Sequence, residues 1–295
     1  GNVAHHVGRG ALSMARGIGP VPLLTTGLAE IALLTLAITF VVATVVANTP
    51  AIDGGSGVYV RAATDVFVTE SAAQRFSDIV TTAGYLNVFL HPITDRAAKS
   101  MSDTVTTTGL FAVCEPVLWT VGRAIKGRPT LVSVPVETSD PGNAGTLIRV
   151  SDAMGADAVV FAGETVDPQS SKAARASAGS LFHLPVARNI GVKDVLGQVR
   201  KAGLQILATS VDGEVDLDDA EELLEKPTAW LFGNEAHGLG EELLAQADHR
   251  VRIPIRGRAE SLNLATAASI CLYESARAQA RASARSRQAR GNDND

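Results

Sequence analysis

The sequence predicts an α/β protein of two domains, in which strands and helices alternate along most of the chain. Short apolar runs are followed repeatedly by helical segments, which is the order that builds parallel sheets. Glycine-rich turns stand at the ends of several of these runs. The length of 295 residues, with 46% hydrophobic and 19% charged residues, provides the core that such a fold needs and excludes a disordered chain.

Net charge and cysteine content indicate how nucleic acid or a metal could be bound. The formal net charge is −5, so any nucleic-acid binding would have to depend on local basic patches rather than on the overall field. Cys114 and Cys271 are far apart and lack the spacing of metal ligands, which favours free thiols in a reducing compartment. The histidines form no convincing ligand set either, so we expect no metal.

Residues 1–60 are atypical and hydrophobic. Residues 31–52 contain no charged side chain and are long enough to span a bilayer. The threonines and β-branched residues in this run weaken its interpretation as a helix. We favour a buried helix or pair of strands in a globular domain, with a membrane-attached protein as the alternative.

Residues 64–125 predict a small α/β unit that completes an N-terminal domain of residues 1–125. The predicted strands are residues 65–69, 86–90 and 110–115, and the predicted helices are residues 70–83 and 95–102. This βαβαβ order implies a small parallel sheet. A charge, a glycine and a proline come together at residues 126–129, which predicts a linker there.

The second domain, residues 126–280, has a fuller alternation. Its predicted strands are residues 130–136, 158–161, 181–186, 205–209, 229–232 and 251–254, and its predicted helices are residues 146–154, 192–202, 216–224 and a last one to about residue 277. Residues 281–295 are expected to form a disordered tail, although their first part could extend the last helix.

Three glycine-rich segments, residues 141–145, 233–238 and 256–258, stand at predicted strand ends. Glycine at such a point lets the backbone turn tightly and approach a ligand. None of the three is a Gly-x-Gly-x-x-Gly dinucleotide fingerprint, and no phosphate-binding Gly-Lys-Ser/Thr or Gly-x-Ser-x-Gly elbow occurs. The common nucleotide-binding and acyl-transfer classes therefore lack their motifs.

Taken together, three ordered motifs resemble the SpoU/TrmH class of SPOUT RNA methyltransferases, over residues 131–277. The motifs are Asn143-Ala-Gly-Thr-Leu-Ile-Arg149, then Leu231-Phe-Gly-Asn-Glu235 with Gly238-Leu239, and then residues 253–263 followed by an alanine-rich helix. Residues 170–180 also look like the segment that this family carries between its motifs.

The resemblance implies an α/β fold with a C-terminal trefoil knot, which is rare among proteins. It also implies S-adenosylmethionine as the methyl donor and a homodimer in which both subunits build the site. The residues at the positions of the donor pocket are Gly233, Ile253 and Leu262, bordered by Ala208 and Thr209.

By the same resemblance, Arg149 would help to deprotonate the ribose 2′-hydroxyl. The residues that would complete the catalytic site are Asn143, Glu235, Ser261 and Asn263. Because the pKa of arginine is above about 12, Arg149 is a poor base, and it could equally remain charged and orient a phosphate. Each of these residues also has an ordinary interpretation, as a turn or cap residue or a solvated charge.

We therefore predict a cytoplasmic RNA 2′-O-ribose methyltransferase that acts on ribosomal RNA. The alternatives are a transfer RNA methyltransferase and a SPOUT-fold RNA-binding protein without catalytic activity. The resemblance implies that the N-terminal domain holds the RNA, although residues 1–60 lack the basic opening that is usual in the family.

Overall fold

The computed structural model describes residues 42–43, 63–102 and 104–292. The chain divides into two compact units, Gly1–Val117 with Gln169–Arg175, and Leu118–Pro168 with Ala176–Asp295. The domain limits expected from the sequence stay predictions. In the described part of the chain, no helix combines the length and the apolar composition needed to cross a membrane. The apolar run 31–52 lies outside the described residues, except for residues 42–43.

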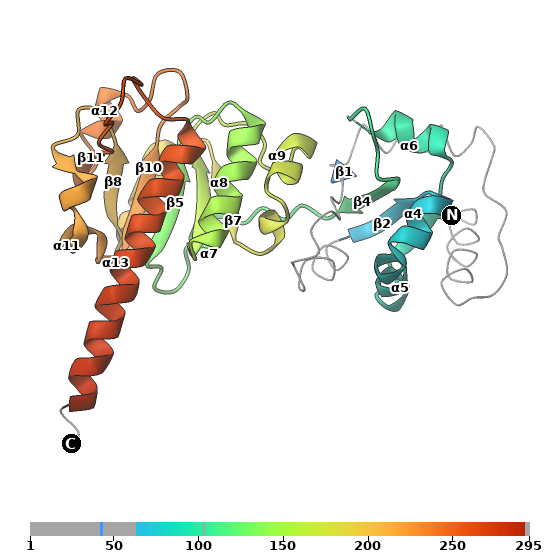
Figure 1. The fold of residues 1–295 in the computed structure, drawn as a ribbon, viewed down its shortest axis with the longest axis horizontal. Helices are drawn as coiled ribbons and strands as arrows, with labels where there is room; N and C mark the ends of the chain where they lie inside the picture. The colour runs from blue at the N-terminus through green and yellow to red at the C-terminus, as the bar shows by residue number, and fades with distance from the viewer. Residues whose placement is uncertain (1–41, 44–62, 103, 293–295) are drawn as a thin grey trace. The chain divides into compact units, whose positions relative to one another are not determined.

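The described part of the smaller unit is built on a sheet in the order β1-β4-β2-β3. Its strands are β1 (Val42–Ala43), β2 (Ala63–Val68), β3 (Phe89–Pro92) and β4 (Leu110–Cys114), and its helices are α4 (Glu70–Arg75), α5 (Ser77–Tyr85) and α6 (Asp95–Met101). α4 and α5 lie on one face of this sheet and α6 lies on the other (Figure 1). Their apolar side chains form two separate clusters with the strands.

The prediction of a wholly parallel sheet in this unit is wrong, because the sheet is mixed. β2 and β3 are parallel, whereas β4 is antiparallel to β2. A parallel β4 would require the connection from β3 to return the chain to the other end of the sheet, and this connection does not do so. β4 therefore begins beside the end of β2, where the Thr69 N–H donates to the Gly109 carbonyl over 2.8 Å.

The larger unit contains a parallel sheet in the order β7-β6-β5-β10-β8-β11-β9, which confirms the predicted α/β class. Its strands are β5 (Leu131–Pro135), β6 (Ala158–Ala162), β7 (Val186–Asn189), β8 (Gln205–Thr209), β9 (Val215–Asp216), β10 (Thr228–Phe232) and β11 (His249–Arg252). Every residue of β5, β6 and β10 is buried, since helices cover both faces.

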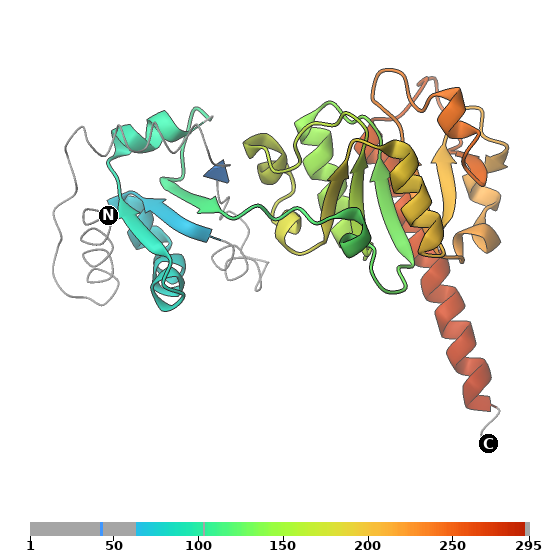
Figure 2. The same ribbon diagram turned by 180° about the vertical axis from the view of Figure 1, so that it is seen from behind.

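Helices form a layer on each face of this sheet. The helices of this unit are α7 (Val121–Ala124), α8 (Pro141–Ala153), α10 (Val192–Lys201), α11 (Glu221–Leu224), α12 (Glu241–Leu244) and α13 (Leu264–Asn292), with short 3-10 turns η1 (Ser180–Phe182) and η2 (Leu217–Asp219). All but the last residue of α9 (Ser171–Ala176) belongs to the smaller unit. α8, α11 and α13 pack on one face (Figure 1), and α7 and α10 pack on the other (Figure 2).

Several predicted element boundaries are wrong. The predicted strand 181–186 contains η1, and β7 begins at Val186. The predicted helix 216–224 divides into the end of β9, η2 and α11, because the Asp216 carboxylate accepts from the Asp218 N–H over 3.1 Å and caps the short turn. β11 starts and ends two residues before the predicted strand 251–254.

The start of α8 is the correction that matters most for the site. Residues 141–145 were expected to be a glycine-rich loop, but they form the first turns of α8. Asp140 is the N-cap, and its carboxylate accepts from the Asn143 N–H over 2.8 Å. Pro141 occupies the first turn, where proline is favoured. Asn143 is therefore held on a helix rather than in a flexible loop.

The expected disordered tail is helical as far as the structure describes it, since α13 continues to Asn292. Alanine, arginine and glutamine are strong helix formers and dominate this segment. Ion pairs also fasten it to α11, from Arg281 to Glu221 over 3.0 Å and from Arg285 to Glu225.

Both cysteines are free thiols, as predicted. Cys271 lies on the buried face of α13, and burial raises its pKa. Burial also raises the pKa of Cys114 to about 11. Neither thiol is therefore poised to react as a thiolate.

A buried hydrogen bond between β10 and α13 gives a test of this packing. The Trp230 indole N–H donates to the Ser275 hydroxyl over 2.8 Å, and both side chains are completely buried. Ser275→Ala leaves the indole N–H unsatisfied, so we expect a loss of about 1–3 kcal/mol in the free energy of unfolding. Urea denaturation measures it. Ser283→Ala, at an exposed position of the same helix, should change nothing, and equal stability of the two variants would contradict this account.

Candidate functional site

The loop that follows β10 is built by close approach of its own backbone. Asn234 and Gly238 pair across it, with N–H to carbonyl distances of 3.1 and 2.9 Å, and Gly238 has a φ of +66°. A Cβ atom on Gly233 would lie 2.4 Å from the carbonyl carbon of Gly238. Only glycine fits at position 233, as its place in the second motif indicated.

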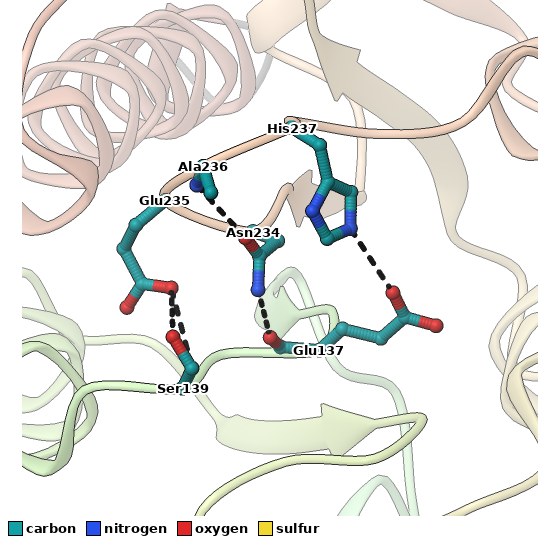
Figure 3. Close-up of polar contacts among 6 residues, drawn as sticks. All are labelled: Glu137, Ser139, Asn234, Glu235, Ala236 and His237. Carbon is teal, nitrogen blue, oxygen red and sulfur yellow. Dashed lines mark hydrogen bonds and ion pairs between the residues drawn. The ribbon is translucent and has the colours of Figure 1, made fainter.

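Asn234 ties this loop to the end of β5 (Figure 3). Its side-chain amide donates to the Glu137 carbonyl over 2.6 Å, and its side-chain oxygen accepts from the Ala236 N–H over 2.8 Å. Glu137 is held at a φ of +52°, and its N–H donates to the Ala162 carbonyl at the end of β6 over 2.9 Å. The carboxyl ends of β5, β6 and β10 are thereby joined.

The Glu235 carboxylate collects hydrogen-bond donors from the segment between β5 and α8. It accepts from the Ser139 N–H and hydroxyl over 3.2 and 3.1 Å, from the Asp140 N–H over 3.3 Å, and from the Asn143 amide over 3.0 Å. Partial burial is the largest influence and raises the pKa of Glu235. The hydrogen bonds from the Asn143 amide and from three backbone N–H groups together outweigh it, and the pKa lies below its ordinary value of 4.5.

Asn143 connects Glu235 to the start of α13. The Asn263 amide donates to the Asn143 side-chain oxygen over 3.0 Å. The Asn263 side-chain oxygen in turn accepts from the N–H groups of Ala265 and Thr266, over 2.9 and 3.2 Å, and caps α13. Three residues predicted from the motifs, Asn143, Glu235 and Asn263, therefore form one hydrogen-bonded chain.

Four of the five predicted donor-pocket residues lie at the carboxyl edge of neighbouring strands. β8 lies between β10 and β11 in the sheet, and it ends with Ala208 and Thr209. Gly233 follows β10 directly, and the half-buried Ile253 follows β11. The Thr209 hydroxyl donates to the Leu231 carbonyl over 3.1 Å. Leu262 is half-buried in the segment before α13. In parallel sheets this edge is where ligands bind.

Two of the predicted site residues, Arg149 and Ser261, are not part of the chain of hydrogen bonds that Glu235, Asn143 and Asn263 form. Arg149 is exposed on α8 and makes no ion pair or hydrogen bond with the described residues. It follows Asn143 by six residues, which places it about 120° away around the helix. Ser261 is exposed before α13, and its hydroxyl has no partner within the described chain.

Four residues of this network were not predicted from the motifs, namely Glu137, Ser139, Asp140 and Asn234. Asp140 could have been found, because an aspartate before a proline is a helix-start signal. Asn234 lies inside the second motif, yet only the fold shows that it holds Glu137. Among the described residues, no group of three or more histidine, cysteine, aspartate or glutamate side chains could hold a metal ion.

Substitution of Gly233 tests the close packing of the β10 loop. Gly233→Ala forces the backbone of residues 238–239 to move, so we expect a clear fall in the thermal unfolding midpoint. Gly257→Ala is the matched control, since a Cβ there meets nothing within 4 Å and no positive φ is required. Similar midpoints for the two variants would show that the loop is looser than described.

The low pKa of Glu235 predicts a pH-dependent contribution to stability. A carboxyl whose pKa is depressed by folding stabilises the protein above its ordinary value of 4.5, and this stabilisation is lost as the pH falls through the lower, folded value. Glu235→Gln should therefore be less stable than the parent at neutral pH. The difference should shrink in unfolding experiments below pH 4.5, and a difference independent of pH would contradict the assignment.

Comparison with known proteins agrees with this geometry. The model of the SpoU rRNA Methylase family matches residues 130–273. A 23S rRNA (uridine(2479)-2′-O)-methyltransferase from Streptomyces viridochromogenes is 39% identical over 142 residues, which are 47% of this chain and 50% of that protein. The 23S rRNA (guanosine(2553)-2′-O)-methyltransferase RlmP from Bacillus subtilis (strain 168) is 36% identical over 134 residues, 45% of this chain and 53% of that protein.

A solved structure covers more of the chain. The AdoMet-bound rRNA methyltransferase from Sinorhizobium meliloti aligns with a TM-score of 0.70 and 27% identity, over 87% of this chain and 97% of that one. By contrast, the chain spans about half the length of the two curated relatives. The SpoU rRNA Methylase model therefore matches the same part of the chain whose motifs resemble the SpoU/TrmH class.

Proposed function

We propose that this protein transfers the methyl group of S-adenosylmethionine to a ribose 2′-hydroxyl of ribosomal RNA. The observation that carries the proposal is the Glu235–Asn143–Asn263 chain of hydrogen bonds at the carboxyl edge of the sheet, inside the segment that matches the family model. Relatives named as 23S rRNA 2′-O-methyltransferases support ribosomal over transfer RNA. The S-adenosylmethionine in the similar structure supports that donor.

The residues at this edge suit such a donor. Gly233 and Ala208 present backbone and little side chain, and the Thr209 hydroxyl is already engaged with Leu231. The Glu137, Asp140 and Glu235 carboxyl groups gather at the same loops, and negative charge favours a ligand that carries a sulfonium and an ammonium group. When bound, S-adenosylmethionine supplies an electrophilic methyl group.

The chain's own residues then have to hold the ribose and remove a proton. The ribose 2′-hydroxyl would have to give up its proton to a base as it accepts the methyl group, so a residue of the chain has to stand near that hydroxyl. Arg149 is our candidate for the residue that meets the ribose, either as this base or as a charged group that orients a neighbouring phosphate. Glu235 and Asn263 hold Asn143 in position, which fixes the donor-side loops before RNA arrives.

The position of Arg149 supports a site shared between two copies of the chain. Within one chain Arg149 lies apart from the Asn143 chain on α8, so a second copy that packs there would bring it to a donor pocket. We propose a homodimer of this kind. We also propose that the C-terminal strands are knotted. The close approach of Gly213 to β11, where a Cβ would lie 2.7 Å from the Arg252 nitrogen, supports tight threading in this region.

Two further proposals concern the unit that binds the RNA and the location of the protein in the cell. We propose that the smaller unit holds the RNA, as the family resemblance implied for the N-terminal domain. We propose a cytoplasmic location, where ribosomal RNA is found.

The reaction is tested with radiolabelled S-adenosylmethionine and unmodified total RNA, followed by size fractionation and alkaline hydrolysis. A 2′-O-methyl group blocks strand cleavage, so we expect label in an alkali-resistant dinucleotide from ribosomal RNA. Arg149→Ala should lower the rate by about 100-fold or more, if it acts on the proton. Label in mononucleotides would mean base methylation and would exclude the ribose assignment. Donor binding without any label would favour a binding protein without catalysis, and label in transfer RNA would change the substrate.

The shared site is tested by mixing two inactive variants. Arg149→Ala retains a donor pocket, and Gly233→Ala retains Arg149. In an equal mixture, about half of the dimers contain one copy of each variant. If Arg149 acts across the dimer, each mixed dimer has one intact site out of two, so the mixture should recover about a quarter of the parent activity. If Arg149 acts within its own chain, no activity should return. Remixing the Arg149→Ala variant with itself is the control.

A further inference from the structure

The C-terminal half of α13 differs from the rest of the methyltransferase unit in charge and in packing. The family match ends at residue 273, whereas the helix continues to Asn292. Residues 275–292 contain five arginines and no acidic residue, in a chain of net charge −5. Figures 1 and 2 both show this part of α13 continuing past the end of the sheet.

The end of this helix is not packed as a core helix would be. Residues 283–289 are all exposed, on every side of the helix. A helix with no buried face gains little from tertiary packing and is stabilised only by its propensity and its side-chain pairs. Alanine is the largest aliphatic side chain in this stretch, so it lacks the apolar and aromatic anchors that protein interfaces use.

The arginines of this helix fall into two groups. Arg277 pairs with Glu274 over 2.6 Å, and Arg281 and Arg285 are held by Glu221 and Glu225. The Arg277 pair lies within α13 itself, whereas the pairs of Arg281 and Arg285 fasten the helix to α11.

Arg287 makes no ion pair with the described residues. It lines a groove of about 480 Å³ together with Ser283, Ser286 and Thr130. Thr130 and Pro227, also in the lining, precede β5 and β10, so the groove lies at the opposite end of the strands from the candidate site. Glu225 in the groove is engaged by Arg285. The Thr130 hydroxyl already donates to Asp157. A guanidinium beside the Ser283 and Ser286 hydroxyls is the chemistry that binds phosphate.

We infer that this helix end, residues 283–289, is an accessory RNA-binding element that grips the phosphodiester backbone away from the methyl-transfer site. The inference rests on the proposed function, which supplies RNA as the partner. Phosphate contacts need positive charge and hydrogen-bond donors but no apolar anchor, which matches this surface. Such contacts position an RNA without reading its sequence, so the element contributes affinity rather than choice of nucleotide.

The test is filter binding of an unmodified 23S rRNA transcript to the full chain and to Arg287→Gln. Glutamine keeps a high helix propensity, and circular dichroism checks that the helix remains. At about 0.1 M salt we expect affinity to fall by roughly threefold or more, and the slope of log K against log salt to decrease by about 0.8. Lys201→Gln on α10 removes the same charge elsewhere and should have little effect.

Other outcomes overturn the inference in distinguishable ways. If the parent binds and methylates the transcript but the arginine variant matches the lysine control, the helix end is not an RNA contact. If the variant instead turns a dimer into a monomer in sedimentation without changing the salt slope, the helix end contacts a second copy. If the parent neither binds nor methylates the transcript, the proposed function fails as well. Calorimetric binding of S-adenosylmethionine, which we expect to be unchanged in both variants, shows that the distant site is intact.

Discussion

The arrangement at the carboxyl edge of the sheet depends on the Glu235 carboxylate and the hydrogen bonds that converge on it. Asn143 is 92 residues from Glu235 in the sequence, and Asn263 is 120 residues from Asn143, yet the three side chains form one chain of contacts. Because Asn263 caps α13 and Asp140 caps α8, the same network sets where both helices begin. A charged acceptor at its centre makes these bonds stronger than neutral ones.

The backbone around this network is packed so closely that side chains are excluded from it. Gly233 faces the backbone of residues 238–239, and Glu137 accepts a positive φ because its N–H and carbonyl are both held. Residues in such conformations persist only where the surroundings determine them. The result is an edge of small residues and backbone groups, which suits a ligand that is bound by its shape and its charge.

The net charge does not describe how charged side chains are distributed, because acidic and basic groups gather at opposite ends of the same sheet. Carboxyl groups gather at the carboxyl edge, whereas arginines gather on the last helix near the opposite edge. The acidic residues of α11 neutralise part of the arginine set, so the overall value of −5 conceals a local basic surface. A cationic donor and an anionic RNA backbone could each find complementary charge on one chain.

The sequence by itself determined the class of fold, the central strands β5, β8 and β10, and the motifs, because apolar runs and glycine positions record burial and tight turns locally. Asp140 and Pro141 are a local signal for the start of α8, although residues 141–145 were predicted to be a loop. Only the tertiary structure decided that β4 runs antiparallel, that Asn234 holds Glu137, and that Arg149 lies apart from Asn143. Those features depend on strand register, helix phase and contacts between residues about a hundred positions apart, which local sequence patterns do not encode.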